Sequence, residues 1–480
     1  KHLQLKLDLG RDSKAITAYA DDHTVDLVAQ SVAKGYVWIQ DKYLQTYDGN
    51  PLLFRPNVSP KIGDEPEDWE EYEDEEKLSL RKVADSAEKS RQALTAAKLA
   101  YLEKLINEKG MAVAMLTLTV PGAYRPDKDD PHSIKACRDW LTQMENRVSA
   151  LVAKENKKRI KQEKKPISFC GIKCTQPHKD ATPHRHVILV THEQDIGWLL
   201  DCWRNVALSI HGDEEGAAEH RCRIDLATKP EDRVRMTRYA SRYASRFVES
   251  KIREAVPQEA EETTIVKTVR GILEELREDA WYRASRTRRY SWFGLMPDNL
   301  WMSIRKQIVR DWRQHCPLIN DDKGKRIPKW SISDFVQRWH KQHLPTPLFH
   351  IVEAVQNGDY HQFMKNIKHF VRIKNNDEAE LMEQNLAWEN ITETKKNRYG
   401  EETTKTTGVR FWVAERSYTW EARLTEGEWM ITDAQGGIFY EPDPITAKNP
   451  LKNKVVGVNA YIPRTEVANK VLDLYATAPP

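Results

Sequence analysis

The sequence lacks the features that mark several large classes of protein. No apolar run approaches the ~20 residues that a membrane-spanning helix needs, and no secretory signal is recognisable, so we expect no membrane partner. The six cysteines form no CxxC pair and no tight framework, which is typical of reduced thiols in a cytoplasm. No GxxxxGK motif followed by Ser or Thr occurs, so a P-loop motor is not expected here.

The chain nevertheless has the length and composition of a folded protein with several domains. Its 480 residues are too many for one ordinary core and predict two to four domains. A hydrophobic fraction of 40% is sufficient for packed domains. The net charge of +3 indicates no particular partner, but residues 64–76, DEPEDWEEYEDEE, form a strongly acidic run. Such a run is usually a solvated face or linker, and the alternative is a DNA mimic that covers a basic groove.

The hydrophobic periodicity between about residues 110 and 250 predicts a sheet with helices. Strands are expected at 113–120, 167–175, 184–190 and 220–228, with helices at about 132–162, 194–208 and 231–250. The order is strand, helix, strand, strand, helix, strand, helix, and the second and third strands are expected to form a hairpin. This is close to the split βαβ pattern. The predicted fold class is therefore α+β, with a central antiparallel sheet, ferredoxin-like in type, covered on one face.

Changes in composition divide the chain into four predicted regions. The sheet region, 110–255, follows a mostly helical N-terminal region, 1–109, which contains the acidic run. Residues 256–395 are rich in Arg, Trp and His and are predicted to form a helical, basic and aromatic DNA-binding region. From 396 to 480, short alternating segments and turns predict a small β-rich C-terminal region.

Two histidines at strand spacing form a candidate metal site. His184 and His186 precede an apolar run and, because alternate strand residues point to the same face, they project together. Gln176 ends the preceding strand and could supply a third ligand across the hairpin, with His178 and His192 as rival ligands. Two nitrogens and an oxygen suit Mg²⁺, Mn²⁺ or Zn²⁺. Two histidines alone are a weak signal, and a strand end with no metal is the alternative.

The segment MTRYASRYASRF supplies candidate nucleophiles. Tyr239 and Tyr243 are four residues apart and therefore lie on one side of the predicted helix. Arg235, Arg242 and Arg246 fall on that side too, which disfavours an ordinary buried aromatic stripe. A phenol flanked by guanidinium groups near a divalent ion is well placed to attack a phosphodiester.

Residues 283–294, RASRTRRYSWFG, alternate basic and aromatic side chains. Arg286, Arg288 and Arg289 could contact a DNA backbone, while the aromatic rings could stack on unpaired bases. We therefore predict that this segment, with the arginines of the tyrosine helix, forms a path for single-stranded DNA. The alternative is a solvated helix end followed by an ordinary core segment.

These motifs together resemble the two-tyrosine branch of the HUH endonuclease superfamily, and within it the bacteriophage gene A type replication initiators. The similarity covers roughly residues 110 to 425. It is carried by LTLTVP, GIKCTQPHKDATPHRHVIL, YASRY, WFGLMPDNLWMSIRK, VEAVQNGDYHQFM and NRYGEETTKTTGV. Three residues depart from the family pattern: Arg185 between the histidines, Gln176 where Glu is common, and Arg242 where Lys often precedes the second tyrosine.

The resemblance implies a metal-dependent DNA nicking and joining endonuclease, located in region 110–255. Such an enzyme would nick an origin through a 5′-phosphotyrosine intermediate on Tyr239 or Tyr243 and initiate rolling-circle replication of a phage genome. It would use one divalent ion, Mg²⁺ or Mn²⁺ with Zn²⁺ as an alternative, held by His184, His186 and Gln176. The expected partners are single-stranded or supercoiled origin DNA and a host helicase with its replication machinery, in the cytoplasm of a bacterial host.

Two groups of alternatives remain open at the level of the sequence. Within the superfamily, the chain could be a transposase, a relaxase or a plasmid initiator. Outside it, the chain could be a non-catalytic DNA-binding protein whose metal site is structural.

Overall fold

A computed structural model describes most of the chain in two compact units. The first unit comprises residues 1–35 and 98–295 with the last three residues, and the second comprises 36–97 and 296–477. The structure describes residues 19–40, 43–46, 80–108, 110–124, 133–244, 248–257, 260–320, 326–373, 384–396, 402–414, 418–423, 429–432 and 438–440. The acidic run at 64–76 and residues 441–480 lie outside these ranges.

A five-stranded antiparallel sheet forms the centre of the first unit. Its strands lie in the order β5-β2-β4-β3-β6. They are β2 (Ala112–Thr119), β3 (Phe169–Pro177), β4 (Pro183–Thr191), β5 (Cys222–Leu226) and β6 (Tyr290–Phe293). The predicted hairpin is confirmed, because β3 and β4 pair in antiparallel register from Phe169 opposite Thr191 to Pro177 opposite Pro183. The edge strand β6 falls within the basic and aromatic segment and pairs with β3.

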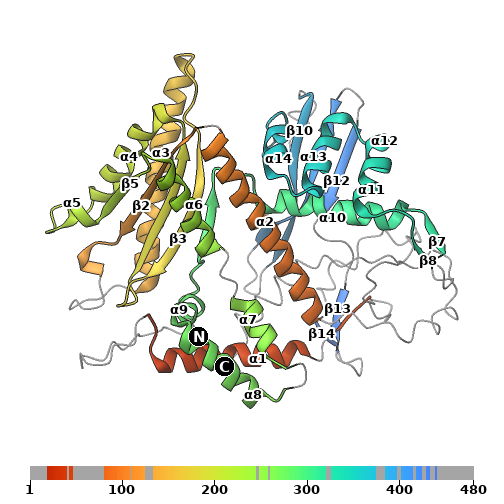
Figure 1. The fold of residues 1–480 in the computed structure, drawn as a ribbon, viewed down its shortest axis with the longest axis horizontal. Coiled ribbons are helices and arrows are strands. Elements are labelled where there is room, and N and C mark those ends of the chain that lie inside the picture. The colour runs from red at the N-terminus through yellow and green to blue at the C-terminus, as the bar shows by residue number, and fades with distance from the viewer. Residues whose placement is uncertain are drawn as a thin grey trace. The chain divides into compact units, whose positions relative to one another are not determined.

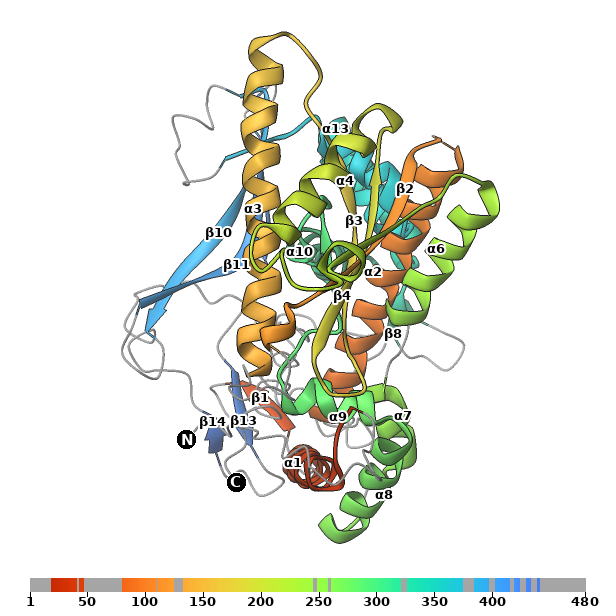
Figure 2. The same ribbon diagram turned by 90° about the vertical axis from the view of Figure 1, so that its left-hand side faces the viewer.

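Helices cover both faces of this sheet, as Figure 2 shows most clearly. One face carries α3 (Ile134–Lys161) and α4 (Glu193–Leu208). The other carries α6 (Pro230–Ala244) and the C-terminal part of α2 (Leu80–Glu108). The expectation of a sheet covered on one face is therefore wrong. The reason lies in the apolar run 187–190 of β4, whose alternate side chains enter two separate cores and so require a cover on each side.

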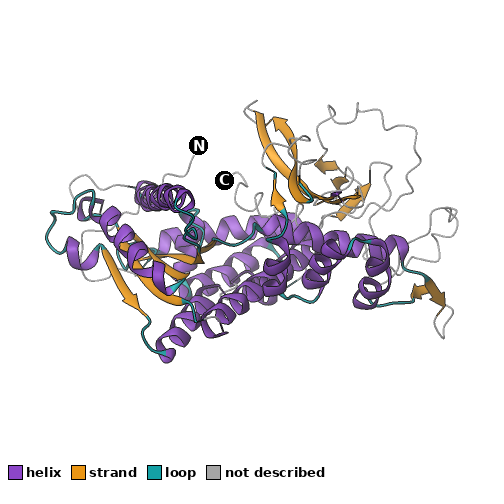
Figure 3. Cartoon of the chain, turned by 90° about the horizontal axis from the view of Figure 1, so that it is seen from above, coloured by secondary structure: helices purple, strands orange, loops and turns teal. Residues whose placement is uncertain are grey.

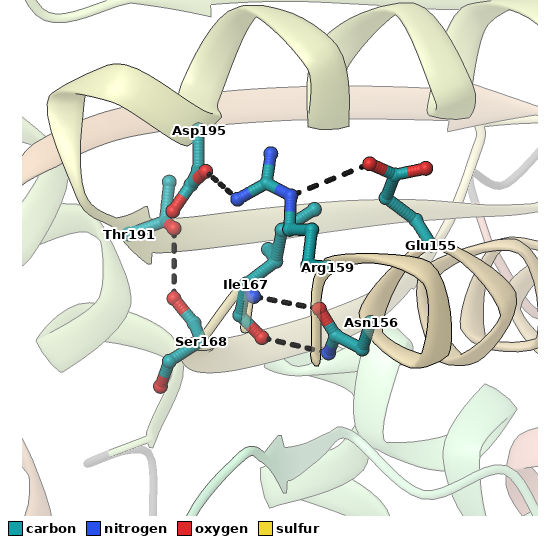
Figure 4. Close-up of polar contacts among 7 residues, drawn as sticks. All are labelled: Glu155, Asn156, Arg159, Ile167, Ser168, Thr191 and Asp195. Atoms are coloured by element: carbon teal, nitrogen blue, oxygen red, sulfur yellow. Dashed lines mark hydrogen bonds and ion pairs between the residues drawn. The ribbon is translucent and has the colours of Figure 1, made fainter. Parts of the chain in front are cut away.

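The basic end of α3 is fixed to the sheet and to α4 by polar side chains (Figure 4). Asn156 both donates to the backbone carbonyl of Ile167, at 3.0 Å, and accepts from its amide, at 2.6 Å. Arg159 pairs with the buried Asp195 of α4 at 2.6 Å. These contacts hold the chain where it enters β3. Asn156 and Arg159 therefore have a structural role at this end of α3.

Most of the remaining helices of the first unit lie below the sheet in the view of Figure 1, and α5 lies at its left side. They are α1 (Asp22–Gln40), of which residues up to Gly35 belong here, α5 (Ala217–His220), α7 (Val248–Ala255), α8 (Glu262–Glu275) and α9 (Arg277–Ala284). A 3₁₀ turn, η2 (Gly122–Tyr124), follows β2. Arg277 pairs with Asp22 at 2.6 Å, which ties α9 to α1.

The second unit combines helices with three small sheets (Figure 3). Its helices are α10 (Asp298–His315), α11 (Ile332–Phe335), the π-helical turn η3 (Val336–His340), α12 (Lys341–His343), α13 (Thr346–Gln356) and α14 (Tyr360–Ile367). Its strands are β1 (Tyr43–Thr46), β7 (Leu318–Asn320), β8 (Arg326–Pro328), β9 (Val371–Arg372), β10 (Leu386–Lys396), β11 (Glu402–Val413), β12 (Tyr418–Arg423), β13 (Trp429–Thr432) and β14 (Ile438–Tyr440). The strands thus begin before residue 396, where the sequence placed the start of the β-rich region.

The architecture as a whole is a mixed α+β fold with antiparallel sheets and many helices. Among the helices that the structure describes, none has the length and apolar character to cross a membrane.

Candidate active site

The two histidines of β4 lie close together at one end of the central sheet. His184 is opposite Thr119 of β2 and Gln176 of β3, and His186 is opposite Thr117 and Cys174. Both histidines share a face with Ile188 and Val190, so they project toward the side that α2 and α6 cover. Their Nε2 atoms are 3.0 Å apart. The predicted shared direction of the two side chains is thus what the structure has.

The environment of this pair keeps both imidazole rings neutral. Burial, reinforced by the neighbouring histidines, lowers the pKa of His184 to about 2. Burial also lowers the pKa of His186 to about 4, against the opposing charge of Asp225 on β5. Neutral rings retain the nitrogen lone pairs that a metal ion needs. The sequence analysis did not identify Thr117 or Asp225 as neighbours of His186. Strand alternation along 220–228 assigns Asp225 to a face of its strand, but it does not show which strand lies next to it.

The hydrogen bonds of the two rings leave nitrogen atoms available for a cation. His186 Nδ1 lies 3.0 Å from Thr117 Oγ1, whereas the buried Nδ1 of His184 has no hydrogen-bond partner among the described residues. Two nitrogens 3.0 Å apart can share one proton. They also have the spacing of adjacent ligands at a right angle around one ion, each about 2.1 Å from it. The donor set therefore fits a divalent metal.

The pairing of β3 with β4 determines which candidate third metal ligands lie near the two histidines. Gln176 is 7% exposed and lies directly across from His184, on the same face. The ring of His178 stacks on that of His184 with centroids 4.0 Å apart, whereas His192 follows the opposite end of β4. No group of three or more His, Cys, Asp and Glu side chains suited to a metal occurs among the described residues. The register thus keeps Gln176 beside the pair as the predicted third ligand, with His178 as the nearby rival.

Arg185, which stands between the histidines, projects to the opposite face of the sheet. It donates from Nε to Thr175 Oγ1 at 3.1 Å and forms an ion pair with Glu145 of α3. Lys173 pairs with the same carboxylate. Arg185 and Glu145 are both buried. This buried cluster connects α3 to β3 and β4 directly behind the histidines, which gives Arg185 a structural role.

Tyr239 of α6 lies beside the histidine pair. Its ring meets that of His186 edge to face, with centroids 5.3 Å apart. The side chain is half-buried at the margin of the core that contains Met236 and Ala244. The backbone of Tyr243 belongs to α6, but its side chain and all of Arg246 lie outside the described residues.

The predicted DNA-binding arginines occupy different environments. Arg235 and Arg242 of α6 are exposed, and Arg235 lies 3.5 Å from Asp232. Arg286 and Arg288 are also exposed in the loop between α9 and β6. Arg289 instead pairs with Asp279 and lies over the ring of Tyr282, 4.7 Å from its centroid. Arg289 therefore also stabilises the packing of α9.

The part of the chain that carries this site is similar to known phage replication proteins. Residues 68–251, which include β2 to β5 and α6, match the model of the family described as bacteriophage replication gene A protein. The replication protein of Haemophilus phage HP1 is 23% identical over 44% of this chain and 26% of its own length. The replication gene A protein of Escherichia phage P2 is 26% identical over 26% of this chain and 17% of its own.

A further relative extends the similarity along the chain. The probable replication protein P12 of Pseudoalteromonas phage PM2 is 23% identical over 63% of this chain and 42% of its own length. The chain thus spans less than half the length of each of these curated relatives. No solved structure matches it. Through residues 68–251, the chain is similar to the bacteriophage replication gene A protein family.

Proposed function

We propose that this chain nicks and rejoins single-stranded origin DNA and so initiates rolling-circle replication of a phage genome, as an HUH-type endonuclease. The observation that carries the proposal is the contact between the rings of Tyr239 and His186. With Tyr239 as the nucleophile, this contact would bring the phenol beside a pair of neutral imidazoles. The strand order β5-β2-β4-β3 supports it, because a split βαβ unit with its two helices on one face has this arrangement.

The chemistry is a transesterification at phosphorus. The phenolic oxygen of a tyrosine attacks the scissile phosphate, the bond from phosphorus to the 3′ oxygen breaks, and the 5′ phosphate remains on the tyrosine. The phenol loses its proton to solvent, and the departing 3′ oxygen takes one up and becomes a free hydroxyl for a polymerase. A divalent ion held by His184, His186 and Gln176 would neutralise the charge that develops on the phosphate.

The exposed arginines of α6 are suited to hold the DNA backbone next to the nucleophile. Arg235 and Arg242 lie on the same helix as Tyr239 and are open to solvent. In the proposed cycle one tyrosine makes the first nick, and the second attacks the regenerated origin after a round of synthesis. The released 3′ hydroxyl then displaces the first tyrosine and closes a circle. Strand separation would come from a host helicase.

The experiment uses the purified chain, Mn²⁺ and a pool of single-stranded oligonucleotides labelled at one end or the other. Cleavage through a 5′-phosphotyrosine predicts that a 3′-end label migrates with the protein on a denaturing gel, while a 5′-end label leaves as a shorter fragment. Mass spectrometry of the adduct should identify a nucleotide-bearing peptide that spans residues 239–243. A chain that binds DNA but forms no adduct would favour the non-catalytic alternative.

Single substitutions at the tyrosines test the division of labour. We expect Tyr239→Phe and Tyr243→Phe to fail differently, because each removes one nucleophile and retains the ring. One variant should lose the first nick, and the other should still nick but release no circular product. The double variant should bind DNA and form no adduct. If both single variants retain full nicking and joining, the tyrosines only pack.

A further inference from the structure

Three parallel aromatic rings are stacked around Trp339 in the second unit, remote in sequence from the histidines and tyrosines. The ring of His315, at the end of α10, lies 4.6 Å from that of Trp339 with an interplanar angle of 8°. The ring of His343, in α12, lies 4.3 Å from it at 17°. Phe335 stacks on the same indole at 5.2 Å and 12°. We call Trp339, His315 and His343 the aromatic stack.

The aromatic stack packs against buried side chains and is itself partly exposed to solvent. Phe335 and His340 are fully buried, and His340 Nε2 lies 2.8 Å from Asp311 of α10. Trp339 is half-buried, whereas His315 and His343 are exposed. The buried side chains of Phe335 and His340 hold the indole of Trp339 in place. The two exposed imidazoles lie nearly parallel to it and are accessible to solvent.

The backbone under the stack is unusual. Val336–His340 forms a π-helical turn, a rare element that occurs frequently at functional sites. His343 Nδ1 donates to the backbone carbonyl of Trp339 at 2.7 Å, which fixes its ring over the indole. The rings are therefore pre-arranged for a ligand that stacks.

The segment that contains the stack is rich in positive charge. Between Arg313 and His343 the sequence has seven Lys and Arg and three Asp, a net charge of +4 in a chain whose total is +3. Lys329, Arg338 and Lys341 are exposed. Arg338 also lies over the ring of Trp330, 5.6 Å from its centroid. In the described part of this segment, Asp334 is the single exposed acidic residue. The β7–β8 hairpin extends beyond the neighbouring helices, as Figures 1 and 3 show.

We propose that the aromatic stack and the cations around it form a second binding surface for single-stranded DNA, separate from the nicking site. Parallel exposed rings accept unpaired bases whatever their sequence, and a border of Lys and Arg accepts the phosphates between them. DNA is the favoured nucleic acid because residues 68–251 are similar to a family of phage replication proteins. This surface would bind the single-stranded DNA that flanks the nick or that is displaced from the duplex.

The first measurement is the affinity for a fluorescent oligothymidylate, in a His184→Ala, His186→Ala background that removes the proposed metal ligands. We expect His315→Ala with His343→Ala to weaken binding at least about fivefold, the loss of one stacked base. An oligomer without bases should bind the two forms equally, because it has nothing to stack. Unchanged oligothymidylate binding in the histidine double variant would overturn the proposal, as would tighter binding of oligouridylate.

The second measurement separates a local phosphate contact from general charge. The salt dependence is the slope of the logarithm of the binding constant against the logarithm of the salt concentration. Arg338→Glu with Lys341→Glu should make this slope shallower by about 0.7 for each lost phosphate contact. The matched control, Lys365→Glu with Lys368→Glu at the C-terminal end of α14, changes the net charge equally at two other exposed positions. Equal effects of the two pairs would overturn the proposal. Nicking of an oligonucleotide limited to the cleavage site should survive in the stack variants, so this inference and the proposed function can fail independently.

Discussion

At the scale of single residues, β4 carries different chemistry on its two faces. His184 and His186 point toward the α6 side, where burial keeps them neutral. Arg185 points to the other side, where its charge meets Glu145. Because alternate residues of a strand point to opposite faces, the guanidinium of Arg185 lies on the other side of the sheet from the candidate metal site at the two histidines. The departure of Arg185 from the apolar residue of the family pattern is compensated by a carboxylate on α3.

The histidines are expected to determine metal affinity. His184→Ala with His186→Ala should abolish Mn²⁺ binding in a calorimetric titration, since two of the three proposed donors are lost. His192→Ala is the matched control, because this exposed histidine lies at the opposite end of β4. The far-ultraviolet circular dichroism of both variants should be that of the parent. Mn²⁺ binding that persists in the double variant would show that the ion is held elsewhere.

Glu145 is expected to be important for stability. Glu145→Gln leaves Arg185 buried without its counter-charge, which should lower the free energy of unfolding by about 3 kcal/mol. Hydrogen exchange of the β3 and β4 amides would report this loss. Glu155→Gln is the control, because it removes a partly exposed pair with Arg159 on the same helix and should cost only about 0.5 kcal/mol. Similar losses in the two variants would argue against a special role for the cluster.

At the scale of elements, the sheet depends on close approaches that only glycine permits. A Cβ at Gly171 of β3 would lie 1.9 Å from the backbone oxygen of Ile188 and 2.8 Å from the ring of Phe293. Both the β3–β4 pairing and the docking of β6 therefore require this glycine. The tight packing brings the candidate DNA segment 283–294 against the strand that contributes Gln176.

Substitution of Gly171 tests this constraint. Gly171→Ala should destabilise the first unit by more than about 2 kcal/mol, because a backbone atom must move to admit the methyl group. Gly271→Ala is the matched control, since nothing lies within 4 Å of a Cβ there and α8 should gain about 0.5–1 kcal/mol. Thermal unfolding followed by circular dichroism compares the two. A neutral Gly171→Ala variant would contradict the close approach.

Local sequence patterns predicted some of these elements and contacts but not others. The apolar run of β4, the hairpin and the shared face of His184 and His186 follow from local periodicity, and all three are confirmed. The pairing of Glu145 with Arg185 joins residues 40 positions apart, and nothing in the local pattern of either segment indicates it. The strand β6 was also missed, because YSWF is short and segment 283–294 was interpreted as a path for DNA.

At the scale of the whole molecule, the two compact units carry two proposed sites of different chemistry. The first unit has the histidine pair and Tyr239, and the second has the aromatic stack. The sequence predicted four regions, and contact between residues groups the described chain into two units. Periodicity cannot show this, because residues 36–97 join the second unit across a long separation in sequence.

Hydrogen exchange with each ligand in turn tests the assignment of one site to each unit. A ligand that binds only the folded state stabilises the region that holds it, by an amount that grows with its concentration above the dissociation constant. Mn²⁺ should therefore slow the exchange of amides in β2, β3, β4 and α6 and leave α10 to α12 unchanged. Oligothymidylate added without metal should slow exchange around residues 313–343. In the His315→Ala, His343→Ala variant this second protection should disappear, whereas the protection by Mn²⁺ should remain. Protection of both units by Mn²⁺ alone would show that the ion binds outside the histidine pair or that the units respond as one. In either case the assignment of one ligand to each unit would be wrong.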